Sequence, residues 1–360
     1  MLKQAIPVKE VEHLAAEALR NLLKEIPLVA LHSISLEQPA GNGQADVVAS
    51  VDVGQEHYVL VCEAKQSGQP RFVRSAIYQL RDYLREFPRS ATPVVIAPYL
   101  SPESRQLCIQ NGMSFLDFEG NVRLQFGTVF IDRLREDKRS PELRELKSIF
   151  RPKSAQVLRV LFRDPAQRWK VADLARAASV SLGHASNVRN ALLDREWAEI
   201  SADGLFLSAP DQLLDAWKSA YVPPVANRLP FYTTMHGELL ESRLRELFAV
   251  VPDNGQVALG SFSAAQWIAP YARTSTLFLW SEKKEAEKIK DRLQLSSSLK
   301  GENVVVSVTQ DNSVFFDAFS AEQSVRCTSP LQTYLDLSKG GERGEEAAQH
   351  LRRIRLSWQR

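Results

Sequence analysis

The amino-acid sequence predicts a multidomain protein of the mixed α/β class. Its 360 residues exceed the size of one ordinary compact domain. Two changes of pattern divide the chain. A basic stretch follows a strand-like run that ends at Ile131, and the paired prolines Pro223 and Pro224 end a helical segment. We therefore expect three domains, at residues 1–135, 150–221 and 225–360.

The composition is that of a globular protein. Hydrophobic residues make up 44% of the chain and charged residues 24%, with 45 Lys+Arg against 43 Asp+Glu. No run approaches the roughly 18 uncharged apolar residues of a membrane-spanning helix, and the amino terminus lacks the apolar core of a signal peptide. A cytoplasmic protein that does not contact a membrane is expected. Cys62, Cys108 and Cys327 are widely separated, which predicts buried thiols rather than disulfides or a zinc site.

The basic stretch between the first two segments carries a local charge of +6. It runs from Arg133 to Arg163 and holds ten Lys or Arg residues against four acids. Binding to nucleic acid depends on such local patches more than on the total charge, which is only +2.

The first segment has a helix followed by a hairpin. Helical periodicity predicts a helix over residues 8–24. Strand-like runs at 45–53 and 57–62 are joined by a short turn at Gly54, which favours a β-hairpin. A further helix is expected over 72–87 and a core strand over 92–97.

The end of the second hairpin strand has residues typical of a catalytic or metal-binding site. Glu63 and Lys65 are two residues apart in a strand, so they share a face. Hairpin pairing would bring Asp46 near Glu63, and two close carboxylates share a proton or bind a hard cation such as Mg²⁺. A lysine beside them could activate water or stabilise charge on a phosphate. The alternative is a solvated ion pair of Glu63 and Lys65 with no function.

With these elements, residues 1–135 resemble the PD-(D/E)xK nuclease superfamily, whose fold is restriction-endonuclease-like. The resemblance rests on the order of elements and on five positions, and Ala45 departs from it because proline would stand there. It implies that Asp46 and Glu63 are metal ligands for Mg²⁺, that Lys65 is catalytic, and that Gln79 is an auxiliary polar group. The acid of the first helix would be Glu12 or Glu10. Asp117 and Glu119 are interpreted as acids that flank a turn.

The middle segment predicts a winged helix-turn-helix. Helices are expected at 154–162, 170–178 and 181–197, with Ser181 as the N-cap of the third. Two short strands, 198–200 and 205–207, flank Asp203 and Gly204, a dipeptide that favours a tight hairpin.

The third helix of this segment is the expected reader of double-stranded DNA. Asparagine can pair with adenine and arginine with guanine in the major groove, and Lys153 and Arg163 from the basic stretch would contact phosphates. The candidate residues on the helix are Ser181, Leu182, His184, Ser186, Asn187, Arg189 and Asn190, with the small Gly183 allowing close approach. The alternative is a winged helix used only for protein contacts.

The last segment predicts a degenerate nucleotidyltransferase-like α/β domain. A strand over 257–261 leads through Gly260-Ser261 into a helix over 263–269 and a strand over 276–280. An active transferase would need acids for Mg²⁺ on that strand, and residues 276–280 contain none. A strand is expected at 304–309, and a helical tail over 331–356 with a break at Gly340-Gly341.

Residues 150–360 resemble the AbiEi family. The resemblance rests on Gly260-Ser261, Ser263-Ala264-Ala265, Ala269-Pro270-Tyr271 with Arg273, the run 329–337, and Glu345-Glu346-Ala347-Ala348. Members of this family are transcriptional regulators that act as antitoxins of type IV toxin–antitoxin systems and repress their own promoters. The resemblance implies a toxin encoded nearby, which the antitoxin need not contact.

Two functions follow as hypotheses. The first is a DNA-binding transcriptional regulator of the AbiEi kind. The second is a Mg²⁺-dependent DNA endonuclease that is targeted by its winged helix. Neither the DNA sequence recognised nor the oligomeric state follows from these patterns.

Overall fold

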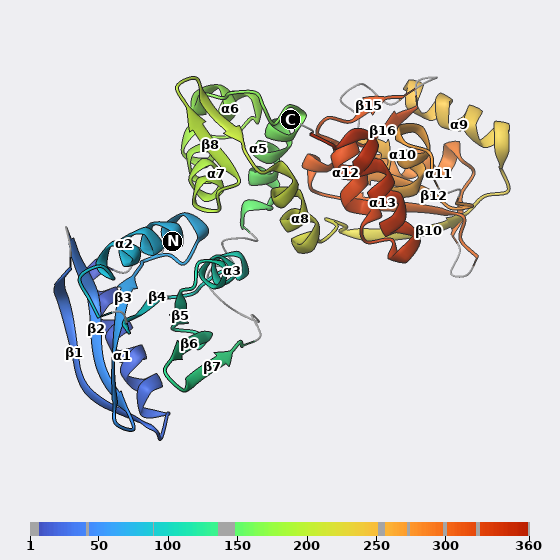
Figure 1. Ribbon diagram of the computed structural model, residues 1–360. Coiled ribbons are helices and arrows are strands. Elements are labelled where there is room, and N and C mark those ends of the chain that lie inside the picture. The colour runs from blue at the N-terminus through green and yellow to red at the C-terminus, as the bar shows by residue number, and fades with distance from the viewer. Residues whose placement is uncertain are drawn as a thin grey trace. The chain divides into compact units, whose positions relative to one another are not determined.

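The chain folds into two compact units (Figure 1). The structure, a computed structural model, describes residues 7–40, 43–88, 90–135, 148–250, 256–271, 274–297, 301–321 and 325–358. Unit 1 comprises residues 1–146 and 190–196, and unit 2 comprises residues 147–189 and 197–360. Within the described ranges, no helix combines the length and apolar character that crossing a bilayer requires.

Unit 1 is built on a seven-stranded mixed sheet whose strands follow one another in chain order. The central strands β3, β4 and β5 are parallel, and the pairs on either side of them are antiparallel. The elements are α1 (Val8–Lys24), β1 (Val29–Ala40), β2 (Gly43–Val53), β3 (Glu56–Ala64), α2 (Pro70–Tyr83), β4 (Thr92–Ala97), α3 (Pro102–Gln110), β5 (Ser114–Asp117), β6 (Val122–Phe126) and β7 (Val129–Arg133).

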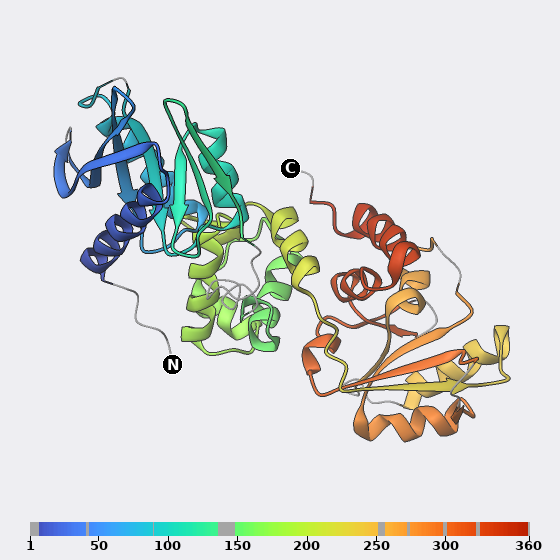
Figure 2. The ribbon, with the colours of Figure 1, turned by 90° about the horizontal axis from the view of Figure 1, so that it is seen from below.

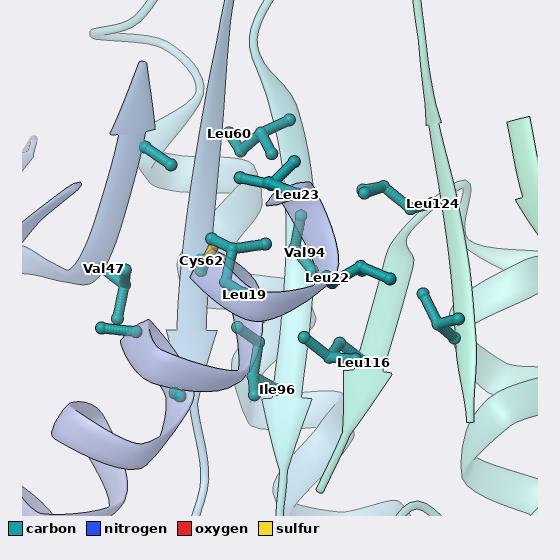
Figure 3. Packing of buried hydrophobic residues seen from close by; sticks show 14 of the residues in the cluster. Leu19, Leu22, Leu23, Val47, Leu60, Cys62, Val94, Ile96, Leu116 and Leu124 are labelled. Carbon is teal, nitrogen blue, oxygen red and sulfur yellow. The ribbon is translucent and has the colours of Figure 1, made fainter. Parts of the chain in front are cut away.

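Two hydrophobic cores cover the two faces of this sheet. Leu19, Leu22 and Leu23 of α1 pack on one face, against β2, β3, β4, β5 and β6 (Figure 3). Ile77 and Leu80 of α2, together with α3, pack on the opposite face. Because α1 buries side chains spaced three and four residues apart, the 3.6-residue period that predicted it is also the period of its contact with the sheet.

The sequence-based boundaries hold for some elements and fail for others. The helix at 8–24 and the strand at 92–97 lie where they were expected. Strand β1, which has 12 residues, was not anticipated. It is an edge strand in which polar residues interrupt the apolar alternation. Helix α2 ends at Tyr83 rather than at residue 87, in keeping with the turn that precedes Pro88.

Unit 2 begins with helices and a small hairpin. The elements are α5 (Pro152–Arg163), α6 (Val171–Ala177), α7 (Leu182–Asp194), β8 (Ala198–Ser201), β9 (Gly204–Leu207) and α8 (Pro210–Ala220). The end of α7, from residue 190 on, belongs to unit 1. Three helices followed by a two-stranded hairpin is the element order expected of a winged helix-turn-helix. Trp169 adds a further bridge to the hairpin, since its backbone exchanges two hydrogen bonds with Leu205.

The rest of unit 2 surrounds a second seven-stranded mixed sheet, in the order β13-β10-β14-β12-β11-β16-β15. Figure 2 shows α12 and α13, in red, on one side of it and α11, in orange, on the other. The elements are β10 (Asn227–Tyr232), α9 (Gly237–Val250), β11 (Val257–Leu259), α10 (Ser261–Ile268), β12 (Leu277–Glu282), η1 (Lys283–Glu285), α11 (Ala286–Arg292), β13 (Ser296–Ser297), β14 (Val304–Thr309), η2 (Asn312–Phe315), β15 (Phe319–Ser320), β16 (Arg326–Cys327), α12 (Pro330–Leu337) and α13 (Gly341–Arg355).

Ion pairs and a buried network join the helices at the start of unit 2 to the second sheet and its helices. Arg352 of α13 pairs with Asp211 and Asp215 of α8. Asp336 of α12 is buried and accepts hydrogen bonds from Tyr221, which follows α8, and from Trp280 of β12, both at 2.7 Å. The three cysteines are free and buried, as expected.

A glycine fixes the loop between β3 and α2. A Cβ placed on Gly68 would lie 1.8 Å from the carbonyl oxygen of Tyr99, and the backbone of Gly68 bridges to Leu100.

We expect Gly68→Ala to lower the free energy of unfolding of unit 1 by about 3 kcal/mol, because the contact is with backbone that cannot rotate away. Calorimetry measures this change. Gly183→Ala is the control, since a Cβ there meets nothing within 4 Å, and equal melting temperatures for the two variants would contradict the prediction.

Candidate functional site

The pairing of β2 with β3 brings Asp46 and Glu63 together. Val47 pairs with Cys62 in the antiparallel register, so the next residues outward are Asp46 and Glu63. The Asp46 carboxylate also accepts a hydrogen bond from the amide of Ala64, at 2.7 Å. This contact holds Asp46 at the end of β3, where Glu63 projects.

Lys65 connects the carboxylates to α2. Its Nζ donates to Glu63 Oε1 at 2.5 Å and to Gln79 Oε1 at 2.6 Å. Its backbone amide donates to Ile96, which continues the parallel pairing of β3 with β4 beyond the last residue of β3. The ammonium is thus held between a charged and a neutral acceptor, with its backbone tied to the sheet.

Glu12, and not Glu10, is the acid of the first helix that faces the site. Glu12 is 7% exposed, whereas Glu10 is exposed on the outer side of α1. Burial raises the pKa of the Glu12 carboxyl, and the charge of Asp46 raises it further. The structure therefore resolves the choice that the sequence left open.

Burial dominates the electrostatics of the two strand carboxylates. Glu63 is 2% exposed, and burial raises its pKa to about 7, with the Lys65 ammonium acting against this effect and the Asp46 charge adding to it. Burial also raises the pKa of Asp46, although the Ala64 amide and Lys65 oppose the change. At neutral pH this pair of carboxylates therefore carries less than two negative charges.

The donor set fits a hard divalent cation. Oε2 of Glu63 is buried and has no hydrogen-bond partner among the described residues. Such an oxygen is costly to leave unsatisfied, and together with the Asp46 carboxylate it offers the oxygen ligands that Mg²⁺ or Mn²⁺ prefers. Asp46 and Glu63 are the residues that would hold the ion, with Glu12 close enough to sense the charge of Asp46.

Tyr83 is a neighbour of the site that sequence reasoning missed. Its hydroxyl lies 3.5 Å from Nε2 of Gln79, one helical turn earlier in α2. The spacing of four residues along a helix was the signal that could have indicated this contact.

Asp117 has a structural role outside this site. Its carboxylate accepts from the amides of Leu100 and Asn121 and from the Asn121 side chain. It therefore secures the turn between β5 and β6, in line with the interpretation of Asp117 as a turn residue.

A second group that could hold a metal lies at the other end of β2. His32, Asp52 and His57 offer ligand atoms within 4.8 Å of one another. Asp52 is six residues beyond Asp46 on the same strand, roughly 20 Å away. Its two oxygens bind the imidazoles at 2.5 and 2.8 Å, so this group is separate from the carboxylate site.

The candidate DNA-reading residues run from Ser181, just before α7, to Asn190 in the second half of that helix. Ser181, Leu182, Asn187 and Asn190 are exposed, whereas Ser186 and Arg189 are half-buried. The Ser181 hydroxyl accepts from the amide of residue 184, which is the expected capping contact.

His184 contributes to packing within the helical module, by which we mean α5, α6, α7 and the β8–β9 hairpin. Its Nε2 lies 3.1 Å from the hydroxyl of Ser154 on α5, and its side chain is half-buried. This hydrogen bond joins α7 to α5, so the His184 imidazole already has the Ser154 hydroxyl as a partner within the protein.

The proposed phosphate-binding residues differ in their surroundings. Lys153 is exposed at the start of α5. Arg163, at the end of α5, makes a bidentate pair with Asp317 at 2.6 to 3.0 Å and stacks over Phe316. Of the remaining basic stretch, Lys138, Arg139, Arg144 and Lys147 lie outside the described residues, as does Arg273.

The side chains of Trp280 and Asp336 pack against the turn at Gly260-Ser261. A Cβ on Gly260 would lie 2.5 Å from Trp280 Cδ1 and 3.5 Å from Asp336. Trp280 in turn donates to Asp336. The glycine therefore permits a tryptophan and a buried carboxylate to approach the turn.

Comparisons with known proteins bear on both units. Residues 207–356 match the model of a family described as a transcriptional regulator, the AbiEi antitoxin of a type IV toxin–antitoxin system. The resemblance to AbiEi is thereby confirmed over this segment. A search of curated proteins gives no match.

Solved structures give matches to the N-terminal part of the chain. A repair endonuclease from Pyrococcus abyssi aligns with a TM-score of 0.22 and 19% identity, over 28% of this chain and 46% of that one. EndoMS in its apo form aligns with a TM-score of 0.21 and 15% identity, over 29% and 45%. Its complex with double-stranded DNA gives 0.21 and 15%, over 32% and 46%. This chain thus spans less than half the length of the structures it matches.

The raised pKa of Glu63 predicts how stability depends on pH without metal. Between its ordinary value of 4.5 and about 7, the folded protein keeps a proton that the unfolded chain loses. The stabilisation is therefore full below pH 4.5 and is lost as the pH rises through 7, by at most roughly 3 kcal/mol. Thermal unfolding in chelator-containing buffers at pH 4.5 to 8 measures it. Glu63→Gln should flatten the decline of stability with rising pH, and Glu10→Gln should leave it unchanged. If stability falls with pH in the same way in the wild type and in Glu63→Gln, the prediction is wrong.

Proposed function

We propose that this protein is a DNA-binding transcriptional regulator, an antitoxin of the AbiEi kind that represses its own promoter. The observation that carries the proposal is the match of residues 207–356 to that family. A cytoplasmic location, double-stranded DNA as partner and a toxin encoded nearby are parts of the same proposal.

The chemistry of α7 supports DNA as the partner. Asn187 and Asn190 are exposed on this helix and offer the paired donor and acceptor that recognise adenine. The small residues Gly183 and Ser186 let DNA approach the helix closely, and Lys153 places an exposed cation at the start of α5. We assign Asn187, Asn190 and Arg189 to base contacts and Lys153 to a phosphate contact.

Binding to the DNA upstream of the coding sequence tests the regulator. Asn187→Ala should weaken binding by 1 to 3 kcal/mol, about 5- to 150-fold, because it removes a base contact. Lys153→Ala should weaken binding to any sequence and reduce the slope of log K against log salt by about 0.9, because one counterion fewer is released. Fluorescence anisotropy over a salt titration measures both effects.

Arg292→Ala is the matched control for these variants, because it removes an exposed charge from α11, outside the helical module. Binding that stays unchanged in both Asn187→Ala and Lys153→Ala would remove α7 and α5 from the interface.

A second function, cleavage of DNA with Mg²⁺, is favoured by the assembly of Glu12, Asp46, Glu63 and Lys65 at one place. The cation would be held by Asp46 and Glu63 and would neutralise charge on a phosphodiester and lower the pKa of a bound water. Lys65 Nζ would stabilise the developing negative charge. Gln79, which binds Lys65 at 2.6 Å, would orient it.

Incubation of supercoiled and branched DNA with Mg²⁺ tests this activity. We expect cleavage that Lys65→Ala and Glu63→Gln each reduce at least 100-fold, since either change removes charge from the reacting centre. Glu10→Gln, on the outer side of the same helix as Glu12, should cleave like the wild type. If neither DNA is cut, or if Lys65→Ala cuts as fast as the wild type, unit 1 is not a nuclease of this mechanism.

A further inference from the structure

A cluster of two histidines and one aspartate spans the first three strands of the unit 1 sheet. It comprises His32 of β1, Asp52 of β2 and His57 of β3. The Asp52 carboxylate lies between the rings, with Oδ2 at 2.5 Å from Nε2 of His32 and Oδ1 at 2.8 Å from Nδ1 of His57. Neither of the two functions considered above uses this cluster.

The hairpin of β2 and β3 places Asp52 opposite His57. The two residues are a cross-strand pair, and the strands are joined by the two-residue turn Gly54-Gln55. Directly paired side chains share one face of a sheet. Val51 belongs to the core under α1, so its neighbour Asp52 projects from the opposite face together with His57. Helix α2 packs on that face further along the strands, which leaves the His57 ring exposed.

A β-bulge brings His32 to the same place. The pairing of β1 with β2 shifts register between Leu31 and Ser33, so His32 is an extra residue of β1 without a partner in the ladder. Such a bulge re-aims a side chain. Ala30 is the residue paired with Asp52, yet the His32 ring reaches its carboxylate. Three neighbouring strands thus each supply one potential metal ligand.

The His57 ring is also held from its second nitrogen. Its Nε2 lies 3.2 Å from the hydroxyl of Ser50, while Nδ1 is the nitrogen on the side of Asp52. Histidines that bind metals commonly engage their other ring nitrogen with an oxygen, which fixes the orientation of the ring. With Nε2–H donating to Ser50, Nδ1 carries the lone pair that a metal ion requires.

The donor set and its spacing suit a small transition-metal dication. Ligand atoms around one tetrahedral zinc ion lie about 3.3 Å apart. The oxygen–nitrogen pairs need to open slightly, and the two rings, with centroids 6.2 Å apart, need to draw together. The histidine side chains are 53% and 55% exposed, which leaves room for this movement and a path for the ion. Two imidazoles with one carboxylate favour zinc over Mg²⁺.

We propose that His32, Asp52 and His57 bind one Zn²⁺ ion, through Nε2 of His32, the Asp52 carboxylate and Nδ1 of His57, with the remaining position open to water or an external ligand. The ion replaces the protons that join the imidazoles to the carboxylate. Because each ligand comes from a different strand, the ion fastens the edge strand β1 to the β2–β3 hairpin. This site is independent of the carboxylates around Glu63 and of the proposed DNA interface.

Calorimetric titration of the full chain, without an added histidine tag, with Zn²⁺ tests the site. Excess Mg²⁺ in the buffer competes for the oxygen ligands of Asp46 and Glu63 and little for imidazole. We expect one equivalent of Zn²⁺ to bind. His32→Ala and His57→Ala should each weaken its affinity at least about 100-fold, because each removes one of three ligands. Ser50→Ala should weaken it about tenfold, because it removes the partner of the second ring nitrogen.

Two controls separate this site from other zinc-binding groups. His236→Ala removes an exposed histidine of unit 2, and Glu63→Gln alters the other candidate metal site. Both should bind Zn²⁺ like the wild type. Zn²⁺ should also raise the melting temperature of the wild type and not that of His57→Ala, which shows in addition that this variant is folded.

Four outcomes would overturn the assignment. They are an absence of Zn²⁺ binding by the wild type, the same Zn²⁺ affinity in His57→Ala as in the wild type, an equal loss of affinity in His236→Ala, and a loss of Zn²⁺ binding in Glu63→Gln alone.

Discussion

The register between β2 and β3 is the constraint on which the candidate site depends. Val47 lies opposite Cys62, and both side chains belong to the core under α1. Because side chains alternate along a strand, a slip of one residue would turn Glu63 towards α1 and bury Cys62 on the opposite face. The apolar residues on the two faces thus exclude the other registers. The nearness of Asp46 and Glu63 is therefore a consequence of core packing, and the hydrogen bond from the Ala64 amide to Asp46 adds to it.

That register buries two carboxylates next to each other, and their neighbours offset part of the free energy that desolvation costs. A solvated ion pair would leave Glu63 exposed and would lower its pKa, since a nearby ammonium favours the charged form. Here Glu63 is 2% exposed and its pKa is raised to about 7. Lys65 offsets part of the cost, and Gln79 keeps Lys65 in place. The interpretation of Glu63 and Lys65 as a solvated surface ion pair is inconsistent with the burial of Glu63.

Local pattern decided which elements could be predicted from the sequence. Helix α1 and strand β4 have clear apolar periods and were placed at their bounds, while edge strand β1 mixes polar with apolar residues and was missed. Glu10 and Glu12 are about 200° apart around the helix, so the apolar period of α1 already favours Glu12, which shares its face with the buried Ala15, Ala16 and Leu19. Arg159 and Gln332 are 173 positions apart. No spacing rule connects them, so their contact had to come from the fold.

Helix α5 contacts both α7 and the helices of the second sheet. Helix α5 begins with Lys153 and Ser154, and Ser154 is bonded to His184 of α7 at 3.1 Å. Further along, Arg159 and Arg163 face the second sheet and its helices. The charge of Arg163 is neutralised by Asp317, so it adds little attraction for phosphate, and the proposed DNA interface would rest on Lys153 and α7.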